Sequence, residues 1–322
     1  ALWNNVFTSD VRIYERHLWN RMEDFSTLML GETGTGKTSA AAAIGRSGLI
    51  PYDEKRGCFA ASFTSTFVAA NLSQYPESII ESELFGHRKG AFTGAIDHHQ
   101  GLFERLSNYG ALFLDEIGEV SVPIQIKLLA VLQERRYSPV GSHEQLRFDG
   151  RVIAATNRSM TELRESRDFR DDFLYRLCSD VIEVPPLRRR LQEHPAELEQ
   201  LVSLLVTRAT GSEAPELSDR VVRSLRATLP DDYPWPGNVR ELEQAVRRVL
   251  LNGRYEGVAL TGGHDDEEQL AADLQAGSLT ATELLSRYCR TLYARLGSYE
   301  QVARHIELDR RTVKKYIERG AD

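Results

Sequence analysis

Two groups of residues have the types and spacing needed for phosphate chemistry. In the run 31–38, Gly-Glu-Thr-Gly-Thr-Gly-Lys-Thr, three glycines precede a lysine and a hydroxyl residue. Glycines let backbone N–H groups wrap phosphate oxygens, and the helix that follows adds partial positive charge. We expect Lys37 to reach the β- and γ-phosphates and the Thr38 hydroxyl to ligate Mg²⁺. The predicted nucleotide-binding residues are Gly31, Glu32, Thr33, Gly34, Thr35, Gly36, Lys37, Thr38 and Ser39.

The second group is a carboxylate pair at the end of an apolar run. Asp115 and Glu116 follow Ala-Leu-Phe-Leu at 111–114. We expect Asp115 to hold the metal and Glu116 to orient and deprotonate a water molecule. Two carboxylates at a strand tip could instead cap the next helix. Asn157, at the polar end of the run 152–156, is a candidate sensor of the γ-phosphate or of that water.

These side chains need a scaffold that brings strand ends together. Short apolar runs at 27–30, 67–70, 111–114, 152–156 and 181–184 alternate with helical patterns. This alternation predicts an α/β fold with a doubly wound, parallel, five-stranded sheet. Ligands of such sheets bind beyond the carboxyl ends of the strands, where Lys37, Asp115 and Asn157 converge.

Composition limits the class of protein. The chain has 322 residues, with 41% hydrophobic and 27% charged, which predicts two domains and allows a small third one. No apolar run is long enough to cross a bilayer, and no signal peptide opens the chain. Cys58, Cys178 and Cys289 are far apart, as expected for free thiols in a reducing cytoplasm. Residues 281–322 carry nine Lys/Arg against six Asp/Glu in a chain of net charge −7, which points to nucleic acid at this end.

A glycine-flanked segment lies between the two phosphate motifs. It is the hexapeptide 90–95, Gly-Ala-Phe-Thr-Gly-Ala, which follows Glu-Leu-Phe-Gly-His at 83–87. Together with the phosphate loop, Leu-Phe-Leu-Asp-Glu-Ile-Gly-Glu at 112–119 and Trp-Pro-Gly-Asn-Val-Arg-Glu-Leu at 235–242, this order of motifs closely resembles one family. It is the AAA+ activators of sigma-54 RNA polymerase, or bacterial enhancer-binding proteins. The resemblance covers residues 3–252.

The resemblance implies an ATP-dependent transcription activator that works as a hexameric ring with ATP and Mg²⁺. Arg170 and Arg176 look like arginine fingers that reach the nucleotide of a neighbouring subunit. Asn71 resembles a switch residue that pairs with Glu116, and Arg240 resembles the sensor arginine of a helical lid. The implied partners are sigma-54 with RNA polymerase and enhancer DNA. The implied sigma-54 contact residues are Gly90, Ala91, Phe92, Thr93, Gly94 and Ala95.

The chain also departs from the family pattern. Thr38 stands where the family usually has an acidic residue, and the segment 46–63 resembles a surface insertion. A second pore loop is expected near 140–144. Most members carry an N-terminal regulatory domain, and none is present here. Regulation by a separate partner protein and excision from a longer chain are both open.

The C-terminal segment has a helical pattern of its own. Apolar residues recur at helical spacing over 284–296, a second helix follows, and Asp309 is placed to cap a third. This order predicts a helix-turn-helix with the last helix in the major groove, although a plain three-helix bundle has the same pattern. The predicted DNA-binding residues are Arg310, Arg311, Thr312, Lys314 and Lys315. The predicted domains are an α/β nucleotide-binding subdomain at 1–187, a helical lid at 188–252, a linker at 253–279 and the helix-turn-helix at 280–322.

Two other functions are compatible with parts of this pattern. A different AAA+ remodeller, such as a chelatase-like or helicase-loading motor, would keep the ATPase residues but lack the Phe-Thr loop tip. A DNA-binding repressor could use the ATPase fold only as a scaffold. The complete set of Lys37, Asp115, Glu116, Arg170 and Arg176 argues against the repressor.

Overall fold

The computed structural model describes residues 5–6, 8–19, 21–257, 273, 279–296, 299–306 and 308–318. The chain forms two compact units, Ala1–Tyr255 and Glu256–Asp322. Most of the predicted linker, 258–272 and 274–278, lies outside the described residues. The finer division into four segments stays a prediction.

The first unit is built on a five-stranded parallel sheet in the order β4-β5-β8-β1-β9. This confirms the predicted fold class. The observed strands end within one residue of the predicted runs. They are β1 (Thr27–Leu30), β4 (Phe67–Asn71), β5 (Ala111–Asp115), β8 (Arg151–Thr156) and β9 (Asp180–Glu183).

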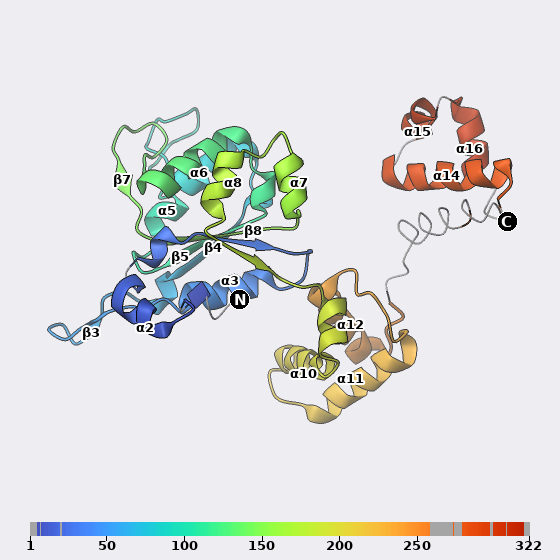
Figure 1. Ribbon diagram of the computed structural model, residues 1–322, viewed down its shortest axis with the longest axis horizontal. Helices are drawn as coiled ribbons and strands as arrows, with labels where there is room; N and C mark the ends of the chain where they lie inside the picture. Colours follow the sequence, from blue (N-terminus) through green and yellow to red (C-terminus); the bar gives the residue numbers. More distant parts are fainter. Residues whose placement is uncertain are drawn as a thin grey trace. The chain divides into compact units, whose positions relative to one another are not determined.

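The sheet forms at these runs because helices cover both of its faces. In Figure 1, α3 (Lys37–Arg46) lies on one face and α6 (Val122–Glu134), α7 (Met160–Glu165) and α8 (Asp171–Leu177) lie on the other. Every residue of β1 and β8 is therefore buried, which explains their near-continuous apolar sequence. Burial of such side chains is the main stabilising term of this unit.

Shorter elements complete this layer. The other helices include α2 (Val11–Ile13), α4 (Glu77–Phe85) and α5 (Leu102–Arg105), with short turns η1 (Tyr14–Leu18), η2 (Met22–Asp24), η3 (Phe63–Ser65), η4 (Leu72–Gln74) and η5 (Ile117–Glu119). Two antiparallel hairpins pair β2 (Tyr52–Asp53) with β3 (Cys58–Phe59) and β6 (Arg136–Tyr137) with β7 (Leu146–Arg147). The first hairpin lies in the predicted insertion 46–63. The second carries the predicted second pore loop between its strands.

A helical lid completes the first unit. Its helices are α9 (Leu187–Glu193), α10 (Glu197–Thr210), α11 (Pro215–Thr228) and α12 (Asn238–Asn252). They enclose a separate hydrophobic core that includes Val206, Val221, Leu242 and Trp235. This core is distinct from those that flank the sheet.

The second unit is helical. It contains α14 (Ala281–Leu296), α15 (Tyr299–His305) and α16 (Arg310–Glu318) around Leu292, Val302 and Val313. The Asp309 carboxylate accepts the N–H groups of Arg311 and Thr312 at 2.9 and 3.0 Å, which confirms the predicted cap. In the part of the chain that the structure describes, no helix has the length and apolar character to span a bilayer.

Candidate functional site

The phosphate loop joins β1 to α3 at the carboxyl edge of the sheet. Gly34 and Gly36 have φ values of 82° and 100°, which only glycine adopts without strain. The Lys37 ammonium donates to the carbonyls of Gly31 and Glu32 at 2.7 and 3.1 Å. Burial lowers the pKa of Lys37, while the Glu116 and Asp115 carboxylates oppose that change. The loop thus places a desolvated cation beside two anions.

The predicted metal ligands meet at this edge. The Thr38 hydroxyl donates to an Asp115 carboxylate oxygen at 3.5 Å. A hydroxyl and a carboxylate are oxygen donors of the kind that Mg²⁺ prefers. The two groups therefore fit the predicted ion by position and by chemistry.

Glu116 has an unusual backbone and a perturbed carboxyl group. Its φ and ψ are 57° and 43°, a left-handed conformation that is uncommon outside glycine and is concentrated at functional sites. Burial, and secondly the charge of Asp115, raise the pKa of its carboxyl group. The backbone N–H of Asn157 hydrogen-bonds that carboxylate. Asn157 is therefore next to the predicted base, and its role as a sensor of the γ-phosphate or of the water stays a prediction.

Asn71 lies beside the carboxylates but points elsewhere. It pairs in register with Asp115 across β4 and β5. Its Oδ1 accepts the N–H and the hydroxyl of Ser73 at 3.0 and 2.7 Å, so the side chain caps η4. Among the residues that the structure describes, Asn71 makes no hydrogen bond to Glu116. The switch contact implied by the family resemblance stays a prediction.

The two predicted arginine fingers are held differently. Arg170 makes an ion pair with Asp172 at 2.7 Å on the surface. Arg176 donates through Nε and Nη2 to the Leu132 carbonyl near the end of α6, at 3.0 and 2.6 Å. Both residues therefore contact α6, Arg176 through its side chain and Arg170 through its backbone N–H, which donates to Gln125 Oε1 at 2.9 Å. The Arg170 side chain pairs with Asp172 beside it.

The lid reaches the phosphate loop through α12. The Val239 N–H donates to the Gly34 carbonyl at 3.0 Å. An added Cβ on Gly34 would lie 3.1 Å from the Arg240 Cβ, and the charge of Arg240 contributes to the lowered pKa of Lys37. Arg240 therefore lies at the loop, as predicted for a sensor residue.

Sequence reasoning missed two residues of this contact. Arg188 donates through Nη1 and Nη2 to the two carboxylate oxygens of Glu32, at 2.9 and 2.5 Å. The fully buried Asn238 donates to Glu32 and to the Thr33 carbonyl, both at 3.1 Å. Asn238 lies within the motif 235–242, but nothing in that motif points to a contact with Glu32, and Arg188 has no local pattern that marks it.

The hexapeptide forms a loop with an exposed tip, while its last residue, Ala95, is buried. The Gly90 N–H donates to the Ala95 carbonyl at 2.8 Å and closes the loop at its base. Gly90 and Gly94 have positive φ, and Phe92 is 48% exposed with its ring 4.9 Å from the His87 ring centroid. Its neighbour Thr93 is exposed as well. The loop tip is thus available to a partner.

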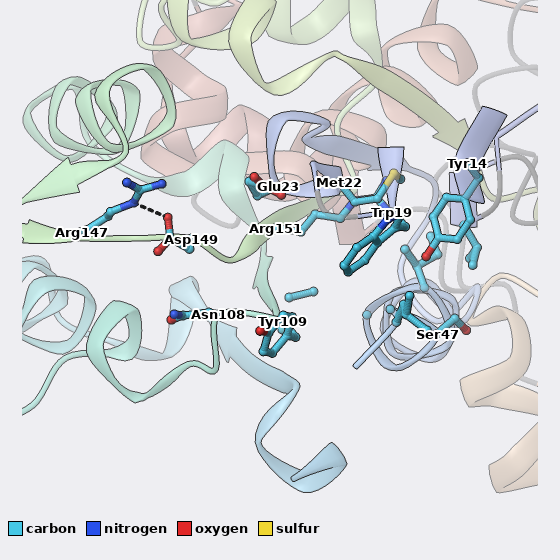
Figure 2. A pocket seen from close by; sticks show the side chains of 17 residues that line it. Tyr14, Trp19, Met22, Glu23, Ser47, Asn108, Tyr109, Arg147, Asp149 and Arg151 are labelled. Atoms are coloured by element: carbon cyan, nitrogen blue, oxygen red, sulfur yellow. Dashed lines mark hydrogen bonds and ion pairs between the residues drawn. The ribbon is translucent and has the colours of Figure 1, made fainter. Parts of the chain in front are cut away.

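Two hollows lie at opposite edges of the sheet. A groove of about 470 Å³ at the carboxyl edge is lined by Gly31, Glu32 and Asn157, among others. A cavity of about 260 Å³ is lined by Ala111 and Arg151, which begin β5 and β8, so it lies at the amino edge. Figure 2 shows the aromatic and charged side chains around it. Because none of the phosphate-site residues lines this cavity, the carboxyl edge is the candidate site.

Comparisons with known proteins agree with this geometry. The family model "Sigma-54 interaction domain" matches residues 11–183, more than half of the chain. A Nif-specific regulatory protein from Azotobacter vinelandii is 39% identical over 274 residues, 84% of this chain and 48% of that protein. The regulatory protein AtoC from Escherichia coli (strain K12) is 38% identical over 226 residues, 70% of this chain and 45% of that protein.

Other relatives support the same grouping. The DNA-binding transcriptional regulator NtrC from Azospirillum brasilense is 41% identical over 229 residues, 70% of this chain and 43% of that protein. The chain spans about half the length of the curated relatives that it matches, or less. A crystal structure of NtrX from Brucella abortus in complex with ADP has the same fold, with a TM-score of 0.55 at 20% identity over 97% of this chain and 67% of that chain.

The motifs, the sheet and these matches all lead to one assignment. The match to the family model runs from α2 to the last residue of β9 and so contains the phosphate loop, the carboxylate pair and the hexapeptide. The chain therefore belongs to the family of sigma-54-dependent transcription activators.

Proposed function

We propose that this chain binds ATP with Mg²⁺ and hydrolyses it at the carboxyl edge of the sheet. The observation that carries this proposal is the convergence of Lys37 and Thr38 with Asp115 and Glu116 from two separate segments, the phosphate loop and the end of β5. Lys37 and the loop amides bind the phosphates, Thr38 and Asp115 hold the metal, and Glu116 accepts a proton from water. Mg²⁺ held there would supply positive charge that offsets the charge developing on the transferred phosphoryl group and on the ADP leaving group.

We further propose that hydrolysis drives the remodelling of sigma-54 RNA polymerase from a closed to an open promoter complex. The exposed tip of the hexapeptide, Phe92 and Thr93, is the contact to sigma-54. The fingers Arg170 and Arg176 act on a neighbouring subunit's nucleotide, which requires a homo-oligomeric ring, a hexamer in this proposal. The helix-turn-helix binds enhancer DNA, and the protein acts in the cytoplasm.

Thr93→Ala tests the coupling between the two steps. Thr93 is exposed at the loop tip and lies outside the nucleotide site, so ATP hydrolysis should stay within twofold of wild type. Open-complex formation on a sigma-54 promoter should fall by at least about tenfold, since the contact made in the activated state is lost. Retention of sigma-54-dependent transcription in this variant would refute the assignment and favour a different AAA+ remodeller.

A further inference from the structure

One acidic residue of the phosphate loop has no role in the proposed chemistry. Glu32 lies between Gly31 and Thr33, and its carboxylate accepts hydrogen bonds from Arg188 and Asn238. These contacts lower the pKa of Glu32, with the Arg188 hydrogen bonds as the largest cause. Its charge is thus neutralised by the lid.

Arg188 and Asn238 begin two different lid helices. Arg188 is the second residue of α9, and Asn238 is the first residue of α12, which carries Arg240. Asn238 also accepts the Leu187 N–H at 2.7 Å, so its one side chain ties α9, α12 and the loop together. Asn238 is fully buried and adopts a φ of 53°, a strained conformation that its surroundings must maintain.

The backbone of the phosphate loop lies so close to the lid and to the end of β9 that no side chain fits between them. A Cβ on Gly34 would lie 2.4 Å from the Gly237 carbonyl oxygen, and one on Gly31 would lie 2.6 Å from the Val184 carbonyl oxygen. The loop is therefore in direct contact with the lid on one side and with the end of β9 on the other. The Lys37 ammonium contacts the carbonyls of Gly31 and of Glu32 itself.

We propose that Glu32 is a positioning residue that clamps the lid onto the phosphate loop through Arg188 and Asn238. The clamp holds Arg240, on α12, at a fixed position relative to Lys37. A change in the phosphates that are bound at the loop is thereby transmitted to the lid. A purely structural ion pair would stabilise the fold without altering the affinity of the folded protein for nucleotide. The proposal rests on ATP binding at this site for its functional part, but the clamp itself can be measured without nucleotide.

The test compares five variants of the full chain, one of them the conservative Arg188→Lys. Glu32→Gln and Arg188→Gln each remove one charge of the pair, and Glu32→Gln/Arg188→Gln removes both. Arg247→Gln is the matched control, since Arg247 pairs with Glu243 at 2.6 Å on the same helix, α12, without contacting the loop. Hydrogen exchange at the Val239 amide, which donates to Gly34, reports lid docking, and titration with a non-hydrolysable ATP analogue in Mg²⁺ reports nucleotide affinity.

In the absence of nucleotide, the Val239 amide should exchange roughly threefold to tenfold faster in each single variant than in wild type. The double variant should exchange no faster than the single variants, because either substitution alone already breaks the pair. The Kd for the analogue should rise by a similar factor at unchanged melting temperature, with Arg188→Lys intermediate and Arg247→Gln like wild type. The proposed clamp would be contradicted if Val239 exchanged at the wild-type rate in the single variants. It would also be contradicted if the free-energy effects of the two single substitutions simply added in the double variant. Failure of wild type to bind the analogue would instead refute the proposed ATPase, and the exchange data would still decide the clamp.

Discussion

Glu116 combines three features expected of a general base. It lies next to the proposed metal ligand Asp115, its backbone is left-handed, and burial raises the pKa of its carboxyl group. Glu116→Gln keeps the shape of the side chain but cannot accept a proton. We expect ATP hydrolysis to fall by roughly 10² to 10⁴ while ATP binding stays within a few-fold, measured by phosphate release and by equilibrium titration.

The control is Glu119→Gln, because Glu119 is paired with Arg158 at 2.9 Å and should retain turnover. The pH profile of wild type adds a second check. A base works only when it is deprotonated, so the raised pKa of Glu116 predicts that kcat/KM falls on the acid side at a pH above the ordinary glutamate value of 4.5. An acid limb at or below that value would contradict this role.

At the scale of elements, Arg176 and Arg170 differ although both are predicted fingers. Arg176 donates two hydrogen bonds to the Leu132 carbonyl and so holds α8 against α6, whereas the Arg170 side chain pairs only with the exposed Asp172. Arg176→Ala should lower the free energy of unfolding by about 1–2 kcal/mol, because a carbonyl loses a charged donor. Arg170→Ala should change it by less than about 0.5 kcal/mol. Urea unfolding of the two variants measures both, and equal effects would show that the Leu132 contact contributes nothing.

The same scale shows what the sequence could predict. The strands β1 and β5 were predictable because burial on both faces demands apolar runs, and the phosphate loop followed from its glycines. The contacts of Glu32 could not be predicted, because its partners Arg188 and Asn238 lie 156 and 206 positions away along the chain. Contacts at such separations produce no local sequence pattern. The same holds for the Arg176 contact to Leu132, 44 positions away. Local motifs thus predict which groups are present, whereas packing decides which of them meet.

At the scale of the whole molecule, arginine fingers that act between subunits make one clear prediction. A Lys37→Ala chain has a defective nucleotide site but keeps both arginine fingers. An Arg170→Ala/Arg176→Ala chain keeps an intact nucleotide site but has no fingers. Each alone should be inactive. In an equal mixture, about one quarter of the interfaces of a heterologous ring combine an intact site with intact fingers, so about a quarter of wild-type turnover should return. A mixture as inactive as its parts, after subunit exchange is shown, would mean that the fingers do not act on a neighbour.

The division into two units separates the proposed ATP chemistry from the proposed DNA binding. Residues Glu256–Asp322 form their own unit, and α16 carries the exposed basic residues Arg310, Arg311 and Lys315. Removing 256–322 should leave ATP hydrolysis at saturating protein within about twofold, because this unit supplies none of the phosphate-site residues. Its loss should weaken enhancer DNA binding by at least about 10², with the remaining binding insensitive to sequence.

A finer variant distinguishes a recognition helix from a merely charged surface. If Lys315 contacts a phosphate, Lys315→Gln weakens binding to every sequence alike and lowers the slope of log K against log salt by about 1. If it contacts a base edge, discrimination between the enhancer and unrelated DNA falls by about 1–3 kcal/mol instead. Titrations of enhancer DNA and of unrelated DNA at several salt concentrations distinguish these two results. If neither the salt slope nor the discrimination changed, α16 would lie outside the interface with DNA.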